Sequence, residues 1–361
     1  MQLRAFVIFI TMLSTIWVVF GGFVAFFLGW VLNLSVAETS AIGAALIAAV
    51  LAYIPSEIYS RKTGQFWVRR LASLILGVFS ILISATAVGY VALAIGMDSK
   101  WLAAAVLGST ALLAIWAIVN NHQRPVVTSL GLHFPHRFAP VRIVQLTDIH
   151  LNGIKSPEWV QRIVDQVNQL KPDIIVFTGD LIDVTRSAIQ PHIDILNTLQ
   201  APHKLAISGN HDFYTGYDEF KFILDAIGFD LIDNRLVQIG DIQFVGVPDV
   251  ESKRFMGMKS IIGQVMEARN PALLTIVLDH RPDHFRRNVG LGANLQLSGH
   301  THWGQLPPFG ILVRLRYRYA AGLKHFRESW IYTSRGTGTW GPPMRLFTRS
   351  EVVVLDLAPT T

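Results

Sequence analysis

The sequence contains no cysteine among its 361 residues. This absence excludes disulfide bonds, thiolate metal ligands and cysteine nucleophiles, although it does not identify a cellular compartment. Charge is also scarce, because only 16% of the residues are Asp, Glu, Lys or Arg, whereas soluble domains average about 25%.

The shortage of charge is confined to residues 1–120. This region has six bases and three acids, namely Arg4, Arg61, Lys62, Arg69, Arg70, Lys100, Glu38, Glu57 and Asp98. The rest of the chain has an ordinary composition and is long enough for one full core. We therefore expect a membrane region at 1–120, a linker and first strand region at 121–140, and a globular domain at 141–361.

Four apolar runs in the first region are long enough for membrane helices, which need about 20 residues. They are Ala5–Leu32, Val36–Pro55, Leu71–Met97 and Trp101–Val119. The first run exceeds the ~7–15 apolar residues of a cleaved signal peptide. None of the runs carries an ionisable residue at its centre, so the pattern indicates an anchor, not a transporter.

The positions of the bases predict the orientation of these helices. Arg61, Lys62, Arg69 and Arg70 lie between the second and third runs, whereas the other two connections carry only Lys100. By the positive-inside rule, the loop at 57–70 is cytoplasmic. We therefore predict a multi-pass protein of the inner (plasma) membrane, with its globular domain in the cytoplasm.

The globular region alternates apolar runs of strand length with helical patterns. Ser156-Pro157 begins one such helix, with a serine N-cap and proline at the first position. The alternation predicts an α/β domain. The expected strands are Val141–Leu146, Ile174–Thr178, Lys204–Ser208, Ile242–Val247, Leu273–Leu278, Asn294–Ser298, Trp330–Thr333 and Val352–Leu357.

Five of these strands end in metal-binding residue types, often beside a glycine. In order, the motifs are Thr-Asp148-Ile-His150, Gly-Asp180-Leu-Ile-Asp183, Gly-Asn210-His211-Asp212, Asp-His280-Arg-Pro and Gly-His300-Thr-His302. Each motif alone is common at a turn or strand end, but five in succession are not expected by chance. Ligands bind where strands end at their carboxyl edge, and oxygen and nitrogen donors of this kind suit a pair of divalent ions.

The motif series resembles that of the calcineurin-like metallophosphoesterases over residues 140–357. The resemblance implies a two-sheet β-sandwich flanked by helices, in addition to the four-helix transmembrane region. It also implies two sets of ligands. The first ion is expected to bind Asp148, His150, Asp180 and His302, and the second to bind Asp180, Asn210, His280 and His300.

The same resemblance assigns the catalytic residues. His211 is expected to protonate the leaving oxygen or stabilise the transition state, and Asp183 is expected to orient it. Ligation by nitrogen and oxygen alone favours manganese, iron or zinc over Cu(I). Related Ser/Thr phosphatases have arginine after the second aspartate of Gly-Asp-x-x-Asp, whereas this chain has Val184, which disfavours a protein phosphatase.

The basic segment after the last motif is the expected substrate rim. Residues 309–349 have eight bases and a single acid, Glu328. We predict that Arg314, Arg316 and Arg318, within the apolar stretch Phe309–Phe326, meet anionic substrate groups. An ordinary edge hairpin with a solvated basic surface is the alternative for this stretch.

The sequence thus predicts a membrane-anchored phosphohydrolase that acts on a phosphodiester or pyrophosphate. The tail Tyr332–Phe347 resembles that of bacterial transmembrane-anchored metallophosphoesterases, and some enzymes of similar architecture are UDP-diacylglucosamine pyrophosphatases. This resemblance implies an amphiphilic or lipid-linked substrate and the bilayer as a partner. The alternatives are a general phosphodiesterase for soluble substrates and a binding scaffold with an inactive site. No nucleic acid partner is expected, because residues 121–308 are nearly balanced in charge.

Overall fold

The computed structural model describes residues 2–360, with side chains from Thr15 onward. The chain divides into two units. The helical unit consists of Met1–His122, Gln305–Gly310 and Gly341–Phe347, and the second unit consists of Gln123–Gly304, Ile311–Trp340 and Thr348–Thr361. Two short stretches from the second half of the sequence therefore belong to the N-terminal helices.

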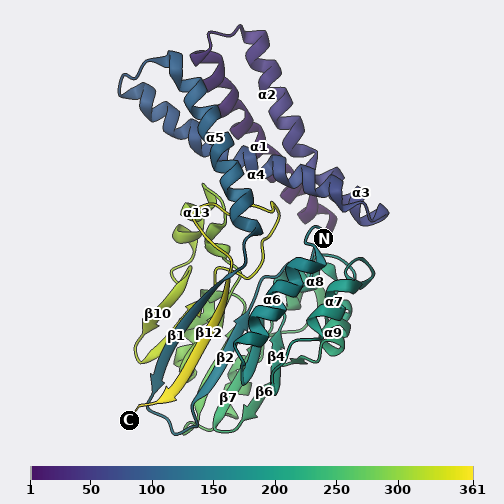
Figure 1. Cartoon of the computed structure of the whole chain (residues 1–361), viewed down its shortest axis with the longest axis vertical. Coiled ribbons are helices and arrows are strands. Elements are labelled where there is room, and N and C mark those ends of the chain that lie inside the picture. The colour runs from purple at the N-terminus through teal and green to yellow at the C-terminus, as the bar shows by residue number, and fades with distance from the viewer. Residues whose placement is uncertain (1, 361) are drawn as a thin grey trace. The chain divides into compact units, whose positions relative to one another are not determined.

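Helices from the first 122 residues form most of the helical unit (Figure 1). They are α1 (Gln2–Val31), α2 (Val36–Leu51), α3 (Tyr53–Thr63), α4 (Phe66–Ala94) and α5 (Ser99–His122). Three segments are long and apolar enough to cross a membrane, namely Val36–Thr63, Phe66–Ala94 and Ser99–His122. The described side chains of α1 form a shorter apolar helix, Thr15–Val31. The expectation of apolar N-terminal helices is confirmed.

The basic loop between the second and third apolar runs is largely helical. It forms α3 and the first turn of α4, and the acid Glu57 lies within hydrogen-bonding distance of two of its bases. Glu57 is 2.6 Å from the Nε atoms of both Arg61 and Arg69. Arg69 is only 4% exposed, so it needs this carboxylate to compensate for its buried charge.

The two inserted stretches pack against α4 and α5. Leu306, Met344 and Leu346 form an apolar cluster with side chains of both helices, among them Ile81 and Ala117. The Ser80 hydroxyl donates a hydrogen bond to the carbonyl of Pro307 at 2.5 Å. The amide of Arg345 donates to the carbonyl of Ala117 at 3.0 Å. No periodicity or motif in the sequence predicts these contacts.

The second unit contains two six-stranded sheets. The first has the order β1-β12-β2-β3-β4-β5 and the second has the order β10-β11-β9-β8-β7-β6. The strands of the first sheet are β1 (Val126–Phe134), β12 (Glu351–Pro359), β2 (Val141–Leu146), β3 (Ile174–Thr178), β4 (His203–Ile207) and β5 (Asp230–Leu231). Those of the second are β10 (Gly322–Phe326), β11 (Ser329–Thr333), β9 (Leu295–Ser298), β8 (Leu274–Asp279), β7 (Ile242–Val247) and β6 (Leu236–Ile239).

The core of this unit lies between the sheets. Val176 and Leu205 of the first sheet pack in one buried cluster with Phe244, Ile276 and Leu297 of the second. Parallel pairing joins β2, β3 and β4 in the first sheet and β7, β8 and β9 in the second. This arrangement confirms the predicted two-sheet sandwich, and parallel pairing brings the carboxyl ends of neighbouring strands to one edge.

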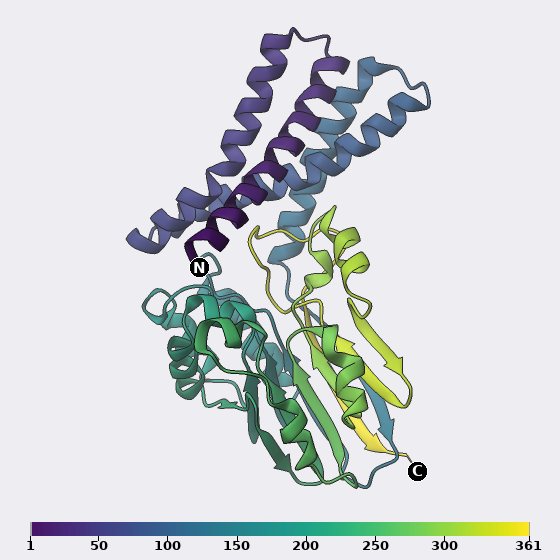
Figure 2. The same cartoon turned by 180° about the vertical axis from the view of Figure 1, so that it is seen from behind.

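Helices flank both outer faces of the sandwich (Figures 1 and 2). They are α6 (Pro157–Gln169), α7 (Gln190–Leu196), α8 (Asn210–Thr215), α9 (Tyr217–Ala226), α10 (Glu251–Met256), α11 (Ile262–Glu267) and α12 (Phe285–Gly290). The predicted N-cap of α6 is present, because the Ser156 hydroxyl accepts a hydrogen bond from the amide of Trp159. Its apolar side, with Ile163 and Val167, is fully buried.

The hairpin alternative for the stretch Phe309–Phe326 is wrong for its first half. Residues Phe309–Arg316 form helix α13, and only Gly322–Phe326 forms a strand, β10, which pairs with β11 at the sheet edge. The spacing of Ile311, Leu312 and Leu315 is helical, since these residues fall on one side of a 3.6-residue repeat.

A larger side chain at Gly77 of α4 should disturb the packing of the inserted stretch Gly341–Phe347. A Cβ atom at Gly77 would lie 2.5 Å from Met344 Sδ and 3.0 Å from Pro342 Cβ. We expect Gly77→Val to destabilise the protein by about 1–3 kcal/mol through overpacking, measured by thermal unfolding in detergent. Gly108→Val on α5 is the control, because nothing lies within 4 Å of that position. Equal unfolding temperatures for the two variants would show that this packing does not form.

Candidate metal centre

The five predicted motifs lie at the carboxyl ends of β2, β3, β4, β8 and β9. Backbone hydrogen bonds join the first two of them. The amide of Asp148 donates to the carbonyl of Gly179 at 2.9 Å, and the amide of His150 donates to the carbonyl of Asp180 at 3.1 Å. The strand ends therefore hold the motif residues at fixed positions relative to one another.

One cluster of ligand atoms comes from Asp148, His150 and His302. The Nε2 atom of His302 lies 3.1 Å from His150 Nε2 and 3.4 Å from Asp148 Oδ1. All three residues are buried. Their ligand atoms converge from two different sheets, because His302 follows β9 whereas the other two follow β2.

A second cluster comes from Asp180, His280 and His300. The Nε2 atom of His280 lies 3.2 Å from Asp180 Oδ2 and 3.3 Å from His300 Nδ1. Asp180 Oδ2 is also 3.6 Å from His150 Nε2 in the first cluster. The Asp180 carboxylate thus lies between the two clusters, where a bridging ligand is expected.

The electrostatics of these residues fit bound cations. Burial lowers the pKa of His280, but the nearby Asp180 carboxylate outweighs this effect and raises it to about 10. Burial and the charge on His280 hold the pKa of its neighbour His300 well below the usual range. The side-chain oxygen of Asn210 is buried without a hydrogen-bond partner among the described residues. A divalent ion would satisfy this oxygen and the converging imidazoles.

The backbone of the ligands is held in an uncommon conformation. Twelve of the described non-glycine residues have positive φ, and five of them are predicted ligands. Their φ values are 53° for Asp148, 50° for His150, 59° for Asp180, 71° for His300 and 48° for His302. Such residues are a few per cent of the total in proteins, and strain of this kind concentrates at functional sites.

Gly179 explains why glycine precedes Asp180 in the second motif. Its φ is +95°, and a Cβ atom would lie 2.6 Å from His280 Nδ1 and 2.8 Å from the Gly209 backbone. Any side chain here would push apart the ends of β3 and β4 and the predicted ligand His280.

His211 lies beside the clusters and is paired with Asp183. Its Nδ1 atom is 2.8 Å from Asp183 Oδ1, and its amide donates to Asp180 Oδ1 at 2.9 Å. Burial lowers the pKa of His211, but the charges of Asp180 and Asp183 outweigh it and raise the value to about 9. The two carboxylates therefore favour the protonated imidazole, whereas bound cations would oppose its charge.

Asp183 contacts two histidines, not one. The same Oδ1 atom lies 3.1 Å from Nδ1 of His150, a predicted ligand. Burial raises the pKa of Asp183, but the two imidazoles hold it well below the usual range. Asp183 is therefore placed to fix the orientation of a ligand as well as that of His211.

Sequence reasoning did not single out Asp212, the fourth residue of the Gly-Asn-His-Asp motif. Its buried carboxylate accepts hydrogen bonds from the amides of Gly209, Asp180 and Leu181 at 2.8, 2.9 and 3.0 Å. Burial and the Asp180 charge raise the pKa of Asp212 to about 8. Through these hydrogen bonds Asp212 connects the end of β4 to the end of β3 and holds the backbone of Asp180 in place.

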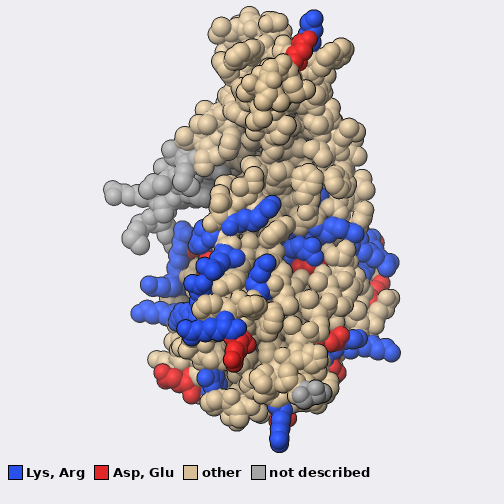
Figure 3. All heavy atoms as spheres, turned by 90° about the vertical axis from the view of Figure 1, so that its left-hand side faces the viewer, with Lys and Arg blue, Asp and Glu red and all other residues tan. Residues whose placement is uncertain are grey.

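Two of the three predicted substrate arginines have contacts that lie outside the two clusters. The guanidinium of Arg314 lies 5.1 Å from the ring centroid of Trp303, and Arg316 is 3.2 Å from Asp283. Lys and Arg side chains gather over the second unit on the face shown in Figure 3.

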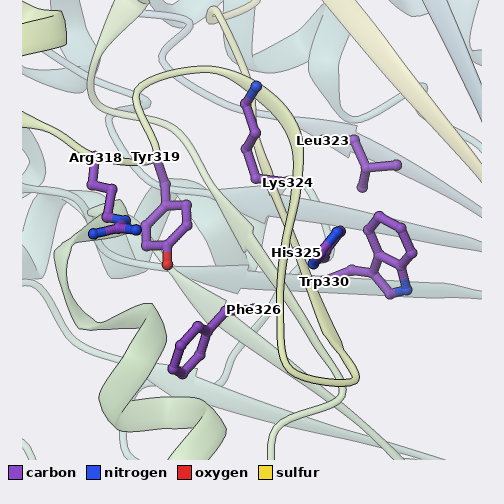
Figure 4. A pocket seen from close by; sticks show the side chains of 7 residues that line it. All are labelled: Arg318, Tyr319, Leu323, Lys324, His325, Phe326 and Trp330. Atoms are coloured by element: carbon purple, nitrogen blue, oxygen red, sulfur yellow. The ribbon is translucent and has the colours of Figure 1, made fainter.

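Arg318 lines a separate shallow pocket at the edge hairpin β10–β11 (Figure 4). The volume of this pocket is about 420 Å³. Its other lining residues are Tyr319, Leu323, Lys324, His325, Phe326 and Trp330.

Sequence reasoning did not assign a role to two further residues that border the site. The hydroxyl of Tyr317 lies 3.0 Å from Nε2 of His300. Arg281, which follows His280 directly, is held by Asp249 through contacts of 2.6 and 3.2 Å. The only sequence signal for Arg281 is its position in the Asp-His-Arg-Pro motif.

Comparison with known proteins agrees with this geometry. The calcineurin-like phosphoesterase family profile matches residues 141–304. An uncharacterised metallophosphoesterase of Bacillus subtilis, YkuE, is 34% identical over 264 residues, which cover 67% of this chain and 87% of that protein. A transmembrane protein with metallophosphoesterase domain from Danio rerio is 31% identical over 265 residues, which cover 69% of this chain and 61% of that protein.

The chain therefore belongs to the calcineurin-like metallophosphoesterases, a family of metal-dependent phosphoesterases. An uncharacterised metallophosphoesterase of Helicobacter pylori is 33% identical over 239 residues, and the matched part is 65% of this chain and 65% of that protein. The chain thus spans about two thirds of the length of this relative.

Removal of the Asp180 carboxylate, the predicted bridge, should disturb both predicted metal positions. We expect Asp180→Asn to lose most bound metal and to reduce hydrolysis of an aryl phosphodiester to the metal-free rate, whereas His302→Ala should weaken one position only. Metal content by mass spectrometry and rates with titrated Mn²⁺ measure both effects. Asp194→Asn, an exposed carboxylate on α7, is the control. Activity that survives thorough chelation, or full activity of Asp180→Asn, contradicts the assignment.

His211 should act in chemistry and not in metal binding. We expect His211→Asn to retain its metal and to lose about 10²–10⁴ in kcat, the usual effect of a positioned acid. Asp183→Asn should lose less rate but should also weaken metal binding, because Asp183 contacts His150. Loss of an ion together with His211 would mean that His211 is a ligand.

Proposed function

We propose that this protein is a membrane-anchored phosphohydrolase with two divalent ions, acting on a phosphodiester or pyrophosphate bond of an amphiphilic or lipid-linked substrate. The observation that carries the proposal is the Asp180 carboxylate between two converging His/Asp clusters. Every ligand position of the family series is filled, and His211 is present, so an inactive scaffold is disfavoured.

The donor set assigns the residues that would hold the ions. Asp148, His150, Asp180 and His302 would hold the first ion, and Asp180, Asn210, His280 and His300 the second, with manganese, iron or zinc as suitable metals. When bound, such ions provide Lewis acidity toward phosphate oxygens and lower the pKa of water to produce a nucleophile at neutral pH.

The protein's own contribution is proton delivery and orientation. Because Asp183 holds His211 Nδ1 at 2.8 Å, the other ring nitrogen, Nε2, is the one that would give a proton to the leaving oxygen. The charges of Asp180 and Asp183 both raise the pKa of His211 and so favour its protonated form. Asp212 accepts a hydrogen bond from the backbone amide of Asp180 and so holds that residue in position.

Two features support a substrate at the membrane. Gln305–Gly310 and Gly341–Phe347 belong to the helical unit, and they begin three residues after His302 and directly after Trp340. The Trp340 ring lies 6.0 Å from the His211 ring. Chain segments that carry site residues thus continue at once into stretches packed against apolar helices, which favours a substrate with an apolar part over a soluble phosphodiester.

The charge pattern supports a cytoplasmic catalytic unit. The loop with Arg61, Lys62, Arg69 and Arg70 is the most basic connection between the apolar helices, and positive connections remain inside. The excess bases at 309–349 would then face an anionic leaflet, where each contributes about 1 kcal/mol near the surface. A C-terminal tag found outside the cytoplasm would contradict this orientation.

The substrate proposal is tested by substrates that differ only in acyl chains. In detergent micelles, the full-length protein should hydrolyse an acyl-bearing pyrophosphate with at least about tenfold higher kcat/KM than the same headgroup without chains, equivalent to about 1.4 kcal/mol. Equal kcat/KM for the two substrates would favour the general phosphodiesterase instead.

The three arginines provide a second arm of the same test. We expect Arg314→Gln, Arg316→Gln and Arg318→Gln, combined, to reduce kcat/KM for the acyl-bearing substrate and to leave that for the soluble ester unchanged. Lys171→Gln, Lys221→Gln and Lys253→Gln, combined, remove equal charge from exposed positions elsewhere in the second unit. If both triple variants lose kcat/KM for the acyl-bearing substrate equally, the arginines act only through their contribution to net charge.

A further inference from the structure

Helix α13 has an apolar side that nothing in the described structure covers. None of its residues is buried. Ile311, Leu312 and Leu315 are 60%, 54% and 79% exposed and share one side of the helix. An isolated helix of eight residues is unstable in water, and an exposed apolar surface of this kind marks an interaction site.

One flank of α13 contacts the segment that carries the last metal motif. Arg314 stacks over Trp303, the residue that follows His302. The amide of Tyr317 donates to the carbonyl of Val313 at 2.8 Å and so closes the last turn of the helix. The Tyr317 hydroxyl then lies 3.0 Å from His300 Nε2. The position of α13 is thus coupled to a predicted metal ligand.

The residues that precede α13 indicate what covers its apolar side. Leu306 packs with Ile81 and Ala117, and the Pro307 carbonyl accepts the Ser80 hydroxyl. Phe309, the first residue of α13, follows Pro307 by two positions, a span of at most about 7 Å. The first residue of α13 is therefore only two residues along the chain from a residue that contacts α4, a helix apolar enough to cross a membrane.

The charge of the segment favours an anionic lipid surface over a second copy of this chain. Residues 309–327 contain Arg314, Arg316, Arg318, Lys324 and Arg327 and no acid. An apolar helix side flanked by arginines is the pattern of helices that lie in the interface of an anionic bilayer. A second copy of this chain would bring the same positive charges together.

The hydrogen bond from His300 to Tyr317 has a defined chemical effect. When the Tyr317 oxygen accepts Nε2–H, the His300 imidazole is held in the tautomer whose Nδ1 lone pair points toward His280 Nε2, 3.3 Å away. Partners of this kind orient a ligand, and their loss typically costs 10–100-fold in metal affinity.

We propose that α13 lies in the surface of an anionic bilayer through Ile311, Leu312 and Leu315, and that Tyr317 transmits its position to His300. The bilayer would then strengthen metal binding by holding α13, and with it Tyr317, in place. Tyr317 is a positioning residue in this scheme. The inference concerns binding alone and does not depend on the substrate of the enzyme.

The first experiment locates α13 by fluorescence. The chain has no cysteine, so Leu315→Cys in full-length protein can be labelled at a single site with a polarity-sensitive dye. The matched control is Phe222→Cys, because Phe222 is an exposed aromatic residue on α9 at 51% exposure. Both proteins are placed in nanodiscs of phosphatidylcholine and phosphatidylglycerol with or without acyl-chain nitroxides.

We expect the label at position 315 to report an apolar environment and to lose more than about half of its emission to the nitroxides, since such helices lie ~5–10 Å deep. The label at 222 should be unaffected. Equal quenching at the two positions, or none at 315, overturns the proposal. An apolar environment at 315 without nitroxide quenching indicates a protein on this surface and also overturns it.

The second experiment tests the coupling through Tyr317. Wild-type protein should bind Mn²⁺ more tightly in phosphatidylglycerol nanodiscs than in detergent, by about tenfold as measured by calorimetry. Tyr317→Phe should bind Mn²⁺ weakly and equally in both. Tyr319→Phe is the control, because the Tyr319 hydroxyl contacts Arg286 and no ligand. A difference between nanodisc and detergent that persists in Tyr317→Phe overturns the role of this residue.

Discussion

The carboxylate of Asp180 is the constraint on which the rest of the site depends. Its Oδ2 atom lies 3.2 Å from His280 and 3.6 Å from His150, and its Oδ1 atom accepts the amide of His211. One side chain thus contacts residues that follow β2, β4 and β8. Negative charge buried at this point requires compensation, and the surrounding imidazoles can provide it only if both sheets end at the same place. Parallel pairing brings the strand ends of each sheet to one edge. Gly179, which has no side chain, lets the ends of β3 and β4 approach His280 closely.

The two other buried carboxylates of the site, Asp183 and Asp212, have different roles. Asp183 and Asp212 both flank Asp180, but their environments differ. Asp183 faces two imidazoles, which hold its pKa well below the usual range. Asp212 faces backbone amides and the Asp180 charge, and burial raises its pKa to about 8. The first is suited to hold protonated histidine, and the second to organise the backbone of two neighbouring strand ends.

The metal-binding motifs were predictable from the sequence because each depends on local order, an apolar strand followed by a short polar turn. The two-sheet sandwich followed from resemblance to a family with the same motifs, and the structure confirms it. Helix α13 was not predicted, since its last four residues, Val313–Arg316, alternate apolar and basic side chains as a strand would. The pairing of Arg316 with Asp283 and of Tyr317 with His300 depends on tertiary contacts that no local pattern records. The packing of Leu306 and Met344 with α4 and α5 was equally hidden, because it joins residues far apart in the sequence.

Strand β12 lies between β1 and β2 in the first sheet (Figure 1), and among the described residues β1 pairs with no other strand. Thr128 of β1 and its hydrogen-bond partner Glu351 of β12 are 223 residues apart in the chain. At about 5–20 residues per second, the ribosome needs roughly 10–45 s to make that interval. During this time the nascent chain carries a nine-residue strand with both edges unpaired, the kind of edge that templates aggregation. Synthesis of this protein therefore includes an interval in which β1 has been made but its partner strand β12 has not.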